Sequence, residues 1–496
     1  MTSSIIILRN QSCKEIVMKR ILTLICLLSV LLSSVSCSAG LEAQQPTAAD
    51  TLTKTQEEVA STTEEETETG PIVYPEGFSV GYARVDITPG EPFKIYNGTG
   101  KSIHDPLMLT CTAVCDGEGV AVLFSVDTKN INETVANGAM KLLEEKFGIP
   151  ADRVMINVTH THSAPDFNRN ETKNWVNYVY EQMIKCTDRA LRDLDPAEAY
   201  VGKGFTDGIT FVRRYLYKTT SKGTDPYAHE SEADNELRTI RFDRKNKKDV
   251  LLINYQTHYG GATSKYKNQY SADFIDPYRK TVEKDLDMLF VYYSGASGNL
   301  NFASDIPKER KYADYIKAID GFMITTKDAL SKEEKVETGK IISTTSLYPG
   351  KIMQDTPERI AQAQEIMGYP ENSAEYQMAL GKYGMVAREA EGINRRSKKG
   401  EIVDVNFTAI SFGDIGFASA PYEMFDTNGK EVRDGSPFKM TFVLSYTNGG
   451  FGYVPSALAW PNKGYEVYIT WFAQGSAEEF SGEMVRLLNE CHAAKN

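Results

Sequence analysis

The sequence predicts an α/β fold in which mixed or antiparallel β-sheets form a sandwich flanked by α-helices, within a single large domain. Apolar runs of strand length outnumber amphipathic runs of helix length, and several strand-like runs follow one another directly. A doubly wound parallel sheet would instead alternate strand and helix. No internal repeat of about 20–50 residues is present, so a solenoid or propeller is not expected.

The expected strands are short apolar runs rich in β-branched and aromatic residues. They are Ser79–Ile87, Met108–Val114, Val120–Val126, Val154–Val158, Leu237–Phe242, Val250–Tyr255, Met288–Tyr293, Ile341–Ser346, Val403–Phe412 and Lys439–Ser445. The expected helices carry apolar residues at helical spacing, three and four apart. They are Glu133–Lys146, Lys173–Leu194, Pro277–Leu286, Lys308–Ala329, Pro357–Ile366, Glu375–Glu391 and Ala477–Leu488.

The N-terminus has the features of an export signal. Lys19 and Arg20 precede an apolar run that is too short to span a bilayer, which needs ~20 residues, and small residues follow it. Cys37 then resembles the lipid-modified cysteine of a bacterial lipoprotein, although a serine stands three positions before it, where an aliphatic residue is usual. We expect residues 1–37 to be a signal peptide with a lipobox-like Cys37, and a conventional signal with an unmodified cysteine is the alternative. The mature protein would be exported and anchored to a bacterial membrane.

Residues 38–70 are expected to be a disordered acidic tether. They carry eight acidic side chains, one lysine and no aromatic residue, a composition that buries too little apolar surface to fold. Residues 71–496 are then one large domain. The whole chain has a net charge of -12. Nucleic acid is not an expected partner, because binding it needs a clustered excess of Lys and Arg.

Three of the six histidines follow apolar strand-like runs. His160 and His162 lie in "NVTHTHSAPD", after Val154–Val158, and an i, i+2 pair on an extended chain projects to one face. His258 ends "VLLINYQTH" and precedes two glycines. Cysteines show no zinc-binding spacing, so a metal would be held by imidazole and carboxylate groups, which suits Zn(II). Two surface histidines are the alternative interpretation of the HxH pair.

Eight segments together resemble the catalytic domain of the neutral/alkaline, non-lysosomal ceramidases. They occur in the family's order across about residues 77–490, and they are "VGYARVDITP", "IHDPL", "VLFSVDT", "NVTHTHSAPD", "INYQTHYGG", "YYSGASGNLN", "APYEMF" and "TNGGFGYVPS". The resemblance implies that residues 71–496 form a ceramidase-like catalytic domain, a zinc amidase that cleaves the N-acyl bond of ceramide.

The resemblance also implies roles for individual residues. The zinc ligands would be His160, His258, Glu423 and Tyr453, with His162 as the neighbouring active-site histidine and Arg213 as a substrate-contacting residue; Tyr453 could ligate the metal or donate to the oxyanion. Without the resemblance, Glu423 is interpreted as a carboxylate at a helix N-terminus. Arg213 and Arg214 equally read as one salt-bridged and one solvated arginine.

The chain departs from the family at one position that matters. Asn301 stands where the ceramidases carry a catalytically important serine, and Ser294 and Ser297 lie nearby. Ser297 imitates a nucleophile elbow but lacks the second glycine of G-x-S-x-G, so it is interpreted as a structural loop residue.

Three functions follow. The first is a zinc-dependent hydrolase of a linear amide, acting on a lipid or small-molecule N-acyl substrate by metal-activated water. The second is a zinc hydrolase of the same fold that acts on another N-acyl or ester substrate. The third is a non-catalytic binding lipoprotein.

Overall fold

The computed structural model describes residues 70–96, 98–206, 208–220, 223–258, 266–302 and 315–495. All of them belong to the second of two compact units, Ala48–Asn496. The expected signal peptide with Cys37, nearly all of the expected tether and the start of the helix expected at Lys308 lie outside the described residues. Among the residues described, no helix is long and apolar enough to cross a bilayer.

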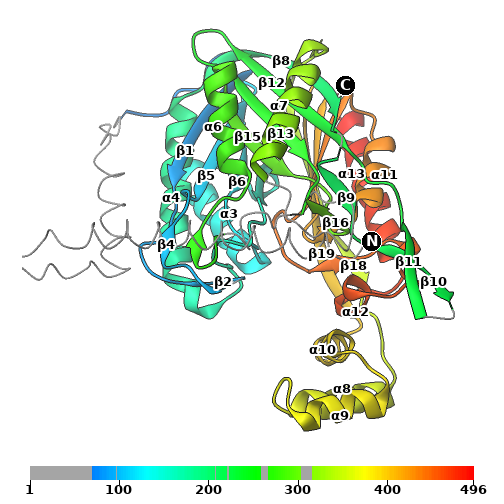
Figure 1. Ribbon diagram of the computed structural model, residues 1–496. Helices are drawn as coiled ribbons and strands as arrows, with labels where there is room; N and C mark the ends of the chain where they lie inside the picture. Colours follow the sequence, from blue (N-terminus) through cyan, green and yellow to red (C-terminus); the bar gives the residue numbers. More distant parts are fainter. Residues whose placement is uncertain are drawn as a thin grey trace, which may run out of the picture. The chain divides into compact units, whose positions relative to one another are not determined.

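A nine-stranded mixed sheet forms the larger layer (Figure 1). Its strand order is β15-β13-β12-β8-β1-β5-β6-β7, with β17 beside β8, and only β6–β7 and β13–β15 are parallel pairs. Its strands are β1 (Ser79–Asp86), β5 (Met108–Cys115), β6 (Val120–Val126), β7 (Val154–Val158), β8 (Asp195–Phe205), β12 (Glu236–Arg244), β13 (Val250–Tyr255), β15 (Leu289–Ser294) and β17 (Glu334–Val336).

A four-stranded sheet packs against the larger one, and this confirms the expected sandwich. It consists of β18 (Ile341–Lys351), β19 (Ile402–Phe412), β20 (Ile415–Ser419) and β22 (Met440–Leu444). Strand β6 shows how the layers arise: Val122 and Phe124 contact the helical layer, whereas Leu123 faces the second sheet and joins Phe412 and Phe417 in a common core. Alternate residues of one strand therefore fill two different cores, which explains why its sequence is apolar except at Ser125.

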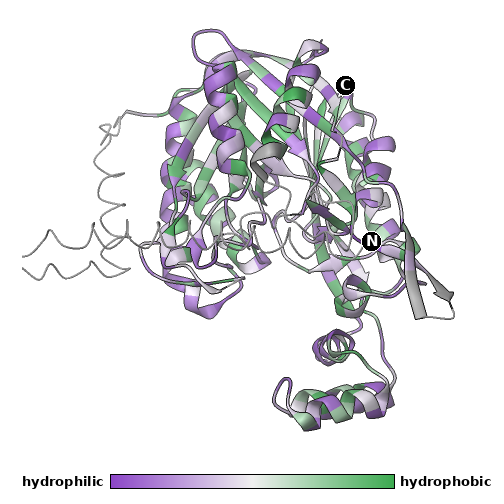
Figure 2. Ribbon diagram, in the orientation of Figure 1, coloured by the Kyte–Doolittle hydropathy of each residue, from purple (hydrophilic) through white to green (hydrophobic). Residues whose placement is uncertain are grey.

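Helices cover the outer face of each sheet (Figure 1). Figure 2 shows apolar residues concentrated on the strands and hydrophilic residues on the outward faces of the helices. The larger sheet is covered by α3 (Glu133–Phe147), α4 (Lys173–Arg192), α6 (Ile275–Leu286) and α7 (Tyr315–Ser331), and the smaller one by α11 (Asp426–Asp434) and α13 (Ser476–Ala493).

Three helices are inserted between the paired strands β18 and β19. They are α8 (Pro357–Gly368), α9 (Ala374–Tyr383) and α10 (Ala387–Arg396), and they share a small apolar core of their own. The prediction of one helix over Glu375–Glu391 is wrong, because Gly384 ends α9 in the left-handed conformation (φ 60°) and Val386 is extended. The strands β8 and β20 and the helix α11 were also not predicted.

The two edges of the larger sheet meet through a buried asparagine. Strands β7 and β15 stand at opposite ends of the strand order, yet Asn157 Oδ1 of β7 accepts a hydrogen bond from Ser294 N of β15 (2.9 Å). Its Nδ2 donates to Ser445 O (2.6 Å) and Thr447 Oγ1 (2.9 Å), after β22. The sheet is curved enough to bring β7 to β15; His160 and His162 follow β7, and His258 follows β13, which pairs with β15.

Candidate active site

His160 and His162 follow β7 directly, as expected. His160 is 2% exposed and has a φ of 61°, a left-handed conformation that is uncommon outside glycine and is often found at functional sites. Its Nδ1 lies 2.7 Å from the carbonyl oxygen of Lys129. A carbonyl can only accept, so Nδ1 carries the hydrogen and Nε2 presents its lone pair. Such a backbone contact orients the imidazoles that bind metals.

The three strand-end histidines converge, which confirms the expectation of a shared site. One ring nitrogen each of His160, His162 and His258 lies within 4.8 Å of the others. His160 Nε2 and His162 Nε2 are 3.2 Å apart. The alternative of two surface histidines is wrong, because His160 and His258 are buried and His162 is half-buried.

Glu423 and Tyr453 reach the same place from a short parallel ladder. Strands β21 (Glu423–Met424) and β23 (Tyr453–Val454) pair these two residues directly. Glu423 Oε2 lies 3.8 Å from His160 Nε2, is buried and has no hydrogen-bond partner. The interpretation of Glu423 as a helix N-terminal carboxylate is wrong, since α11 begins only at Asp426.

Arg213 lies beside this pair. Its Nη2 donates to Tyr453 Oη (3.1 Å) and Gly298 O (2.9 Å), and its Nε donates to Glu466 Oε1 (2.8 Å). Arg214 is also paired. Its Nη1 donates to Glu466 (2.6 Å), and its Nε donates to Glu230 (2.8 Å), which directly follows β11 (Gly223–His229). The alternative in which one of the two arginines is solvated is therefore wrong.

Burial sets the protonation of these groups. It lowers the pKa of His162 to about 3, with smaller contributions from Lys129 and Arg213, and it holds the pKa values of His160 and His258 well below the usual range. Burial raises the pKa of Glu423 to about 7, against the stabilising effect of Tyr453 and Arg213 on the carboxylate. The phenol of Tyr453 also has a raised pKa, through burial and then Glu423, so it keeps its proton.

These residues fit a divalent cation. The imidazoles are neutral, as metal ligands must be, and their nitrogens share one small volume. Glu423 adds a buried carboxylate oxygen that no donor satisfies, which a cation would compensate. Imidazole nitrogens and a carboxylate oxygen that share one small buried volume suit Zn(II).

Two solved structures share this architecture. A crystal structure of neutral ceramidase from Pseudomonas aeruginosa matches with a TM-score of 0.63 and 14% identity, covering 85% of this chain and 75% of that chain. The chain has the neutral-ceramidase fold. A structure of a ceramidase complexed with C2 matches at TM-score 0.65 and 16% identity, covering 85% and 76%. No family model matches the chain, and no curated protein matches it.

The serines near the ceramidase-like segment do not resemble a nucleophile. Ser297 Oγ is buried and hydrogen-bonds to Tyr446 Oη (3.2 Å), as suits the structural role expected for it. Asn301 lies in β16 (Leu300–Phe302), which pairs with β9 (Thr210–Val212) opposite Phe211. The position that carries serine in the ceramidases is thus part of a β-ladder here.

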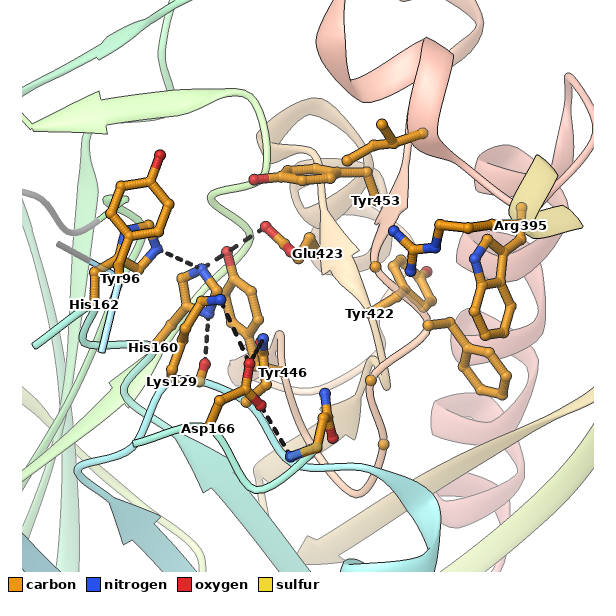
Figure 3. A pocket seen from close by; sticks show the side chains of 18 of the residues that line it. Tyr96, Lys129, His160, His162, Asp166, Arg395, Tyr422, Glu423, Tyr446 and Tyr453 are labelled. Atoms are coloured by element: carbon orange, nitrogen blue, oxygen red, sulfur yellow. Dashed lines mark hydrogen bonds and ion pairs between the residues drawn. The ribbon is translucent and has the colours of Figure 1, made fainter. Parts of the chain in front are cut away.

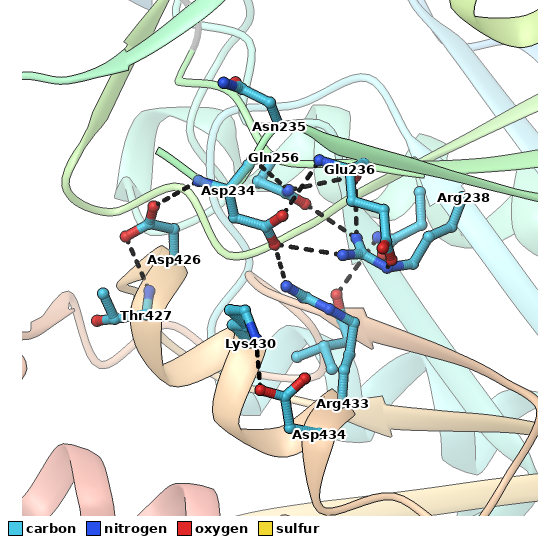
Figure 4. A network of polar contacts seen from close by, with 12 residues as sticks. Asp234, Asn235, Glu236, Arg238, Gln256, Asp426, Thr427, Lys430, Arg433 and Asp434 are labelled. Carbon is cyan, nitrogen blue, oxygen red and sulfur yellow. Dashed lines mark hydrogen bonds and ion pairs between the residues drawn. The ribbon is translucent and has the colours of Figure 1, made fainter. Parts of the chain in front are cut away.

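A buried polar network fixes the segments that carry Glu423 and the Arg213 contact, and Figure 4 shows the part of it around Asp234, Asp426 and Arg433. Asn299 Nδ2 donates to Asp426 Oδ1 (2.6 Å), and Asp426 N donates back to Asn299 Oδ1 (2.9 Å). Asp426 Oδ2 accepts from Asp234 N (3.0 Å), and the Asp234 carboxylate pairs with Arg433. Glu423 lies three residues before Asp426, and Gly298 directly precedes Asn299, so the network fixes the positions of both segments.

Sequence reasoning missed two residues of the site. Tyr446 stacks on the His160 ring (centroids 4.1 Å apart, 16° between planes), and Lys129 supplies the carbonyl that orients it. The only sequence signal near Tyr446 is the turn-forming "TNGG" that follows it. Its left-handed φ of 54° was not visible in the sequence.

The site opens into a cavity of about 530 Å³ (Figure 3). His160, His162, Glu423 and Tyr453 surround one end, and Arg395 lies across the cavity with its guanidinium turned inward. Its other lining residues are Tyr96, Lys129, Asn130, Asp166, Asn168, Arg169, Arg388, Glu391, Tyr422, Tyr446, Gly449, Gly450, Phe451, Gly452, Tyr465, Ile469 and Trp471. Charged and polar side chains predominate, which is unusual for a cavity meant for hydrocarbon chains.

Proposed function

We propose that the protein is a zinc-dependent hydrolase of a linear amide (N-acyl) bond, related in chemistry to the ceramidases. The observation that carries this proposal is the meeting of His160, His258, Glu423 and Tyr453 from four separate segments in the neutral-ceramidase fold. The proposed ligands are His160, His258 and Glu423 together with Tyr453. Zn(II) bound there would lower the pKa of a water molecule to ~7 and polarise the substrate carbonyl.

The neighbouring residues would handle the proton and the charge that the reaction creates. His162 is neutral and faces the cavity, so its free ring nitrogen can accept the proton of the attacking water and return it to the departing amine nitrogen. The Tyr453 hydroxyl keeps its proton and can donate to the oxygen of the developing oxyanion.

Arg213 would support Tyr453 and the substrate. Its guanidinium donates to the Tyr453 oxygen, which directs the phenolic hydrogen away from Arg213. The positive charge 5.4 Å from the Tyr453 ring centroid also stabilises negative charge on this side of the site. We also propose that Arg213 contacts the substrate, as the resemblance to the ceramidases implies.

The polar cavity favours a substrate other than ceramide. A double-chain lipid needs an extended apolar lining, whereas this cavity carries at least four lysine or arginine side chains on its wall. Asn301 in place of the family's serine points the same way. We therefore also propose, as the second candidate, hydrolysis of another N-acyl or ester substrate by the same residues.

Metal analysis combined with a substrate screen tests the proposal. The purified protein should contain about one zinc, and it should hydrolyse fluorogenic ceramide, short N-acyl amides or esters. His160→Ala and His258→Ala should lose both zinc and turnover, whereas the matched change His492→Ala, on α13, should lose neither. Zinc with no turnover on any acyl substrate would support a non-catalytic binding protein, and an absence of zinc with unchanged turnover in both variants would overturn the metal role.

The location of the protein is also a proposal. We propose that it is exported, processed and lipidated at Cys37, so that the tether of residues 38–70 holds the catalytic domain of residues 71–496 off a membrane. Metabolic labelling with a fatty acid tests this. Label in the membrane fraction that disappears in Cys37→Ser is expected, and a wild-type protein without label contradicts the proposal.

A further inference from the structure

The end of the cavity opposite the histidines is formed by the helical insertion. Helix α10 contributes Arg388, Glu391 and Arg395 to the lining. The insertion stands between the two paired strands β18 and β19, which form a continuous ladder without it. The sandwich does not need the insertion to pair these strands, so the insertion can serve the cavity that it lines.

Helix α10 is held firmly in place. Gly392 lies so close to α12 (Tyr465–Ile469) that a Cβ atom there would be 1.9 Å from Tyr468 O. The next turn is fixed by Arg396, 5% exposed, which donates to Asp355 Oδ1 (2.9 Å) and Tyr468 O (3.0 Å). Arg395 adjoins this anchor, so buried contacts fix its backbone position beside the cavity.

The charge of α10 at the cavity is not balanced. Glu391 pairs closely with Arg388 (Oε2 to Nη1, 2.6 Å) and only loosely with Arg395 (Oε1 to Nη1, 3.8 Å). One carboxylate thus serves two arginines, and half of the Arg395 side chain is exposed. Trp471 and Phe451 also line the cavity, with their ring centroids 5.9 Å apart.

We propose that Arg395, supported by Arg388, binds an anionic group of the substrate, so that the enzyme acts on N-acyl compounds that carry a negative charge. This inference rests on the proposed hydrolase function and adds the substrate class. A planar guanidinium pairs with two oxygens of a carboxylate or phosphate at once, which makes the contact specific. The neutral head of ceramide offers no such group.

Matched substrates test the proposal. A set of N-acyl amino acids with a free carboxylate, the same compounds as carboxamides, and N-acyl phosphoethanolamines should be compared by kcat/KM. The carboxylate or the phosphate series should exceed the neutral series by ~10-fold or more, as expected for a charge-assisted pair. Which anionic series is the faster identifies the source of the charge. Equal rates for all three series overturn the proposal but leave the hydrolase function standing, whereas no hydrolysis of any series overturns the hydrolase function.

Substitutions in α10 test whether Arg395 is the residue that selects the anionic substrates. Arg395→Gln should reduce the preference for the anionic series ~10-fold, Arg395→Lys should restore part of it, and Glu391→Gln should increase it because a competing carboxylate is removed. Arg486→Gln is the matched control: Arg486 is equally exposed and also pairs with a glutamate four residues away, on α13 outside the cavity lining.

Calorimetry on the protein treated with a chelator completes the test, with the N-acyl glycine and its carboxamide as ligands. Tighter binding of the carboxylate in the wild type that is lost in Arg395→Gln supports the proposal. Unchanged selectivity in Arg395→Gln overturns it.

Discussion

At the residue scale, the roles of His160 and His162 differ although they are two positions apart. Both line the cavity, but His160 is only 2% exposed, is oriented by the Lys129 carbonyl and is stacked on Tyr446, whereas His162 is half-buried and lies against Tyr96. A ligand must be rigidly held, and a group that moves a proton must reach the substrate. The surroundings of the two imidazoles therefore favour a ligand role for the first and proton transfer for the second.

Replacing His162 separates the two roles. We expect His162→Ala to keep zinc near the wild-type content while kcat falls ~10²–10⁴-fold, the usual cost of losing a general acid–base. His160→Ala should lose the metal as well. Elemental analysis of both purified variants and steady-state kinetics check this. If His162→Ala loses zinc as completely as His160→Ala does, then His162 is itself a ligand.

Asp105 is a buried carboxylate outside the cavity lining, and its protonation should affect stability. Its carboxylate accepts from Ser271 Oγ (2.7 Å) and from Ala272 N, and His104, Asp273 and Asp276 are the charged or titratable groups around it. Burial raises its pKa to about 7, and the nearby acids add to the shift.

The raised pKa of Asp105 makes the free energy of unfolding depend on pH. Between about pH 4, near the pKa of an unfolded aspartate, and pH 7, the folded protein keeps a proton that the unfolded chain has released. The free energy of unfolding should therefore fall as the pH rises through this window, by on the order of 3 kcal/mol. Asp105→Asn should reduce this slope in Tm measured from pH 5 to 8, leaving the part contributed by Glu423, whose pKa is also raised to about 7, whereas Asp243→Asn, at a partly exposed site, should keep the full slope. An unchanged slope in Asp105→Asn would contradict the assignment.

At the scale of elements, most regular segments could be predicted from the sequence. The strands β6, β7 and β13 have the expected bounds, because each is a mainly apolar run with a single polar residue, and its apolar side chains fill two cores. Strand β8 was missed because its pattern mixes exposed and buried residues with a proline and glycines. Helix α11 was missed because it is short and buries Asp426 and Asn428, polar residues whose partners come from distant segments.

The site could be predicted in its residues but not in its geometry. The positions of His160, His162 and His258 after apolar runs suggested a shared site, and resemblance alone singled out Glu423 and Tyr453. Nothing in the sequence shows that the sheet curves until its two edges meet at Asn157, or that two-residue ladders align Glu423 with Tyr453. Such contacts join residues that are 30 positions apart, for Glu423 and Tyr453, and 137 apart, for Asn157 and Ser294, and no local pattern encodes them.

The close packing of α10 against α12 can be tested directly by substitution of Gly392. Gly392→Ala places a methyl group against Tyr468 O, so we expect α10 to shift, stability to fall by ~1–3 kcal/mol and KM to rise. Gly381→Ala is the matched control: Gly381 lies in α9, with open space around its Cα, and alanine there should be neutral or stabilise by up to ~1 kcal/mol. Thermal unfolding and kinetics of both variants check this, and equal behaviour of the two would show that the close packing does not position α10.

At the scale of the whole molecule, the proposed ligands come from separate parts of the sandwich. His160 follows β7 at one edge of the larger sheet, His258 follows β13 near the other edge, and Glu423 lies on the chain between the smaller sheet and α11. A metal held by all three would favour the assembled domain over any opened form, since the unfolded chain cannot present the three together.

Removal of the metal should therefore lower the stability of the entire domain and not only of the site. Binding adds RT ln(1 + [L]/Kd) to the free energy of unfolding, about 2.7 kcal/mol when free zinc is 100-fold above Kd. We expect a chelator to lower Tm in one cooperative transition and added zinc to restore it. His160→Ala and His258→Ala should have the low Tm with or without zinc, whereas His492→Ala should respond as the wild type does. Amide exchange should quicken at the ends of β7 and β13 together after chelation. A Tm that is indifferent to chelation in the wild type would mean that no metal joins these edges, and Asn157 and its partners would then have to hold them alone.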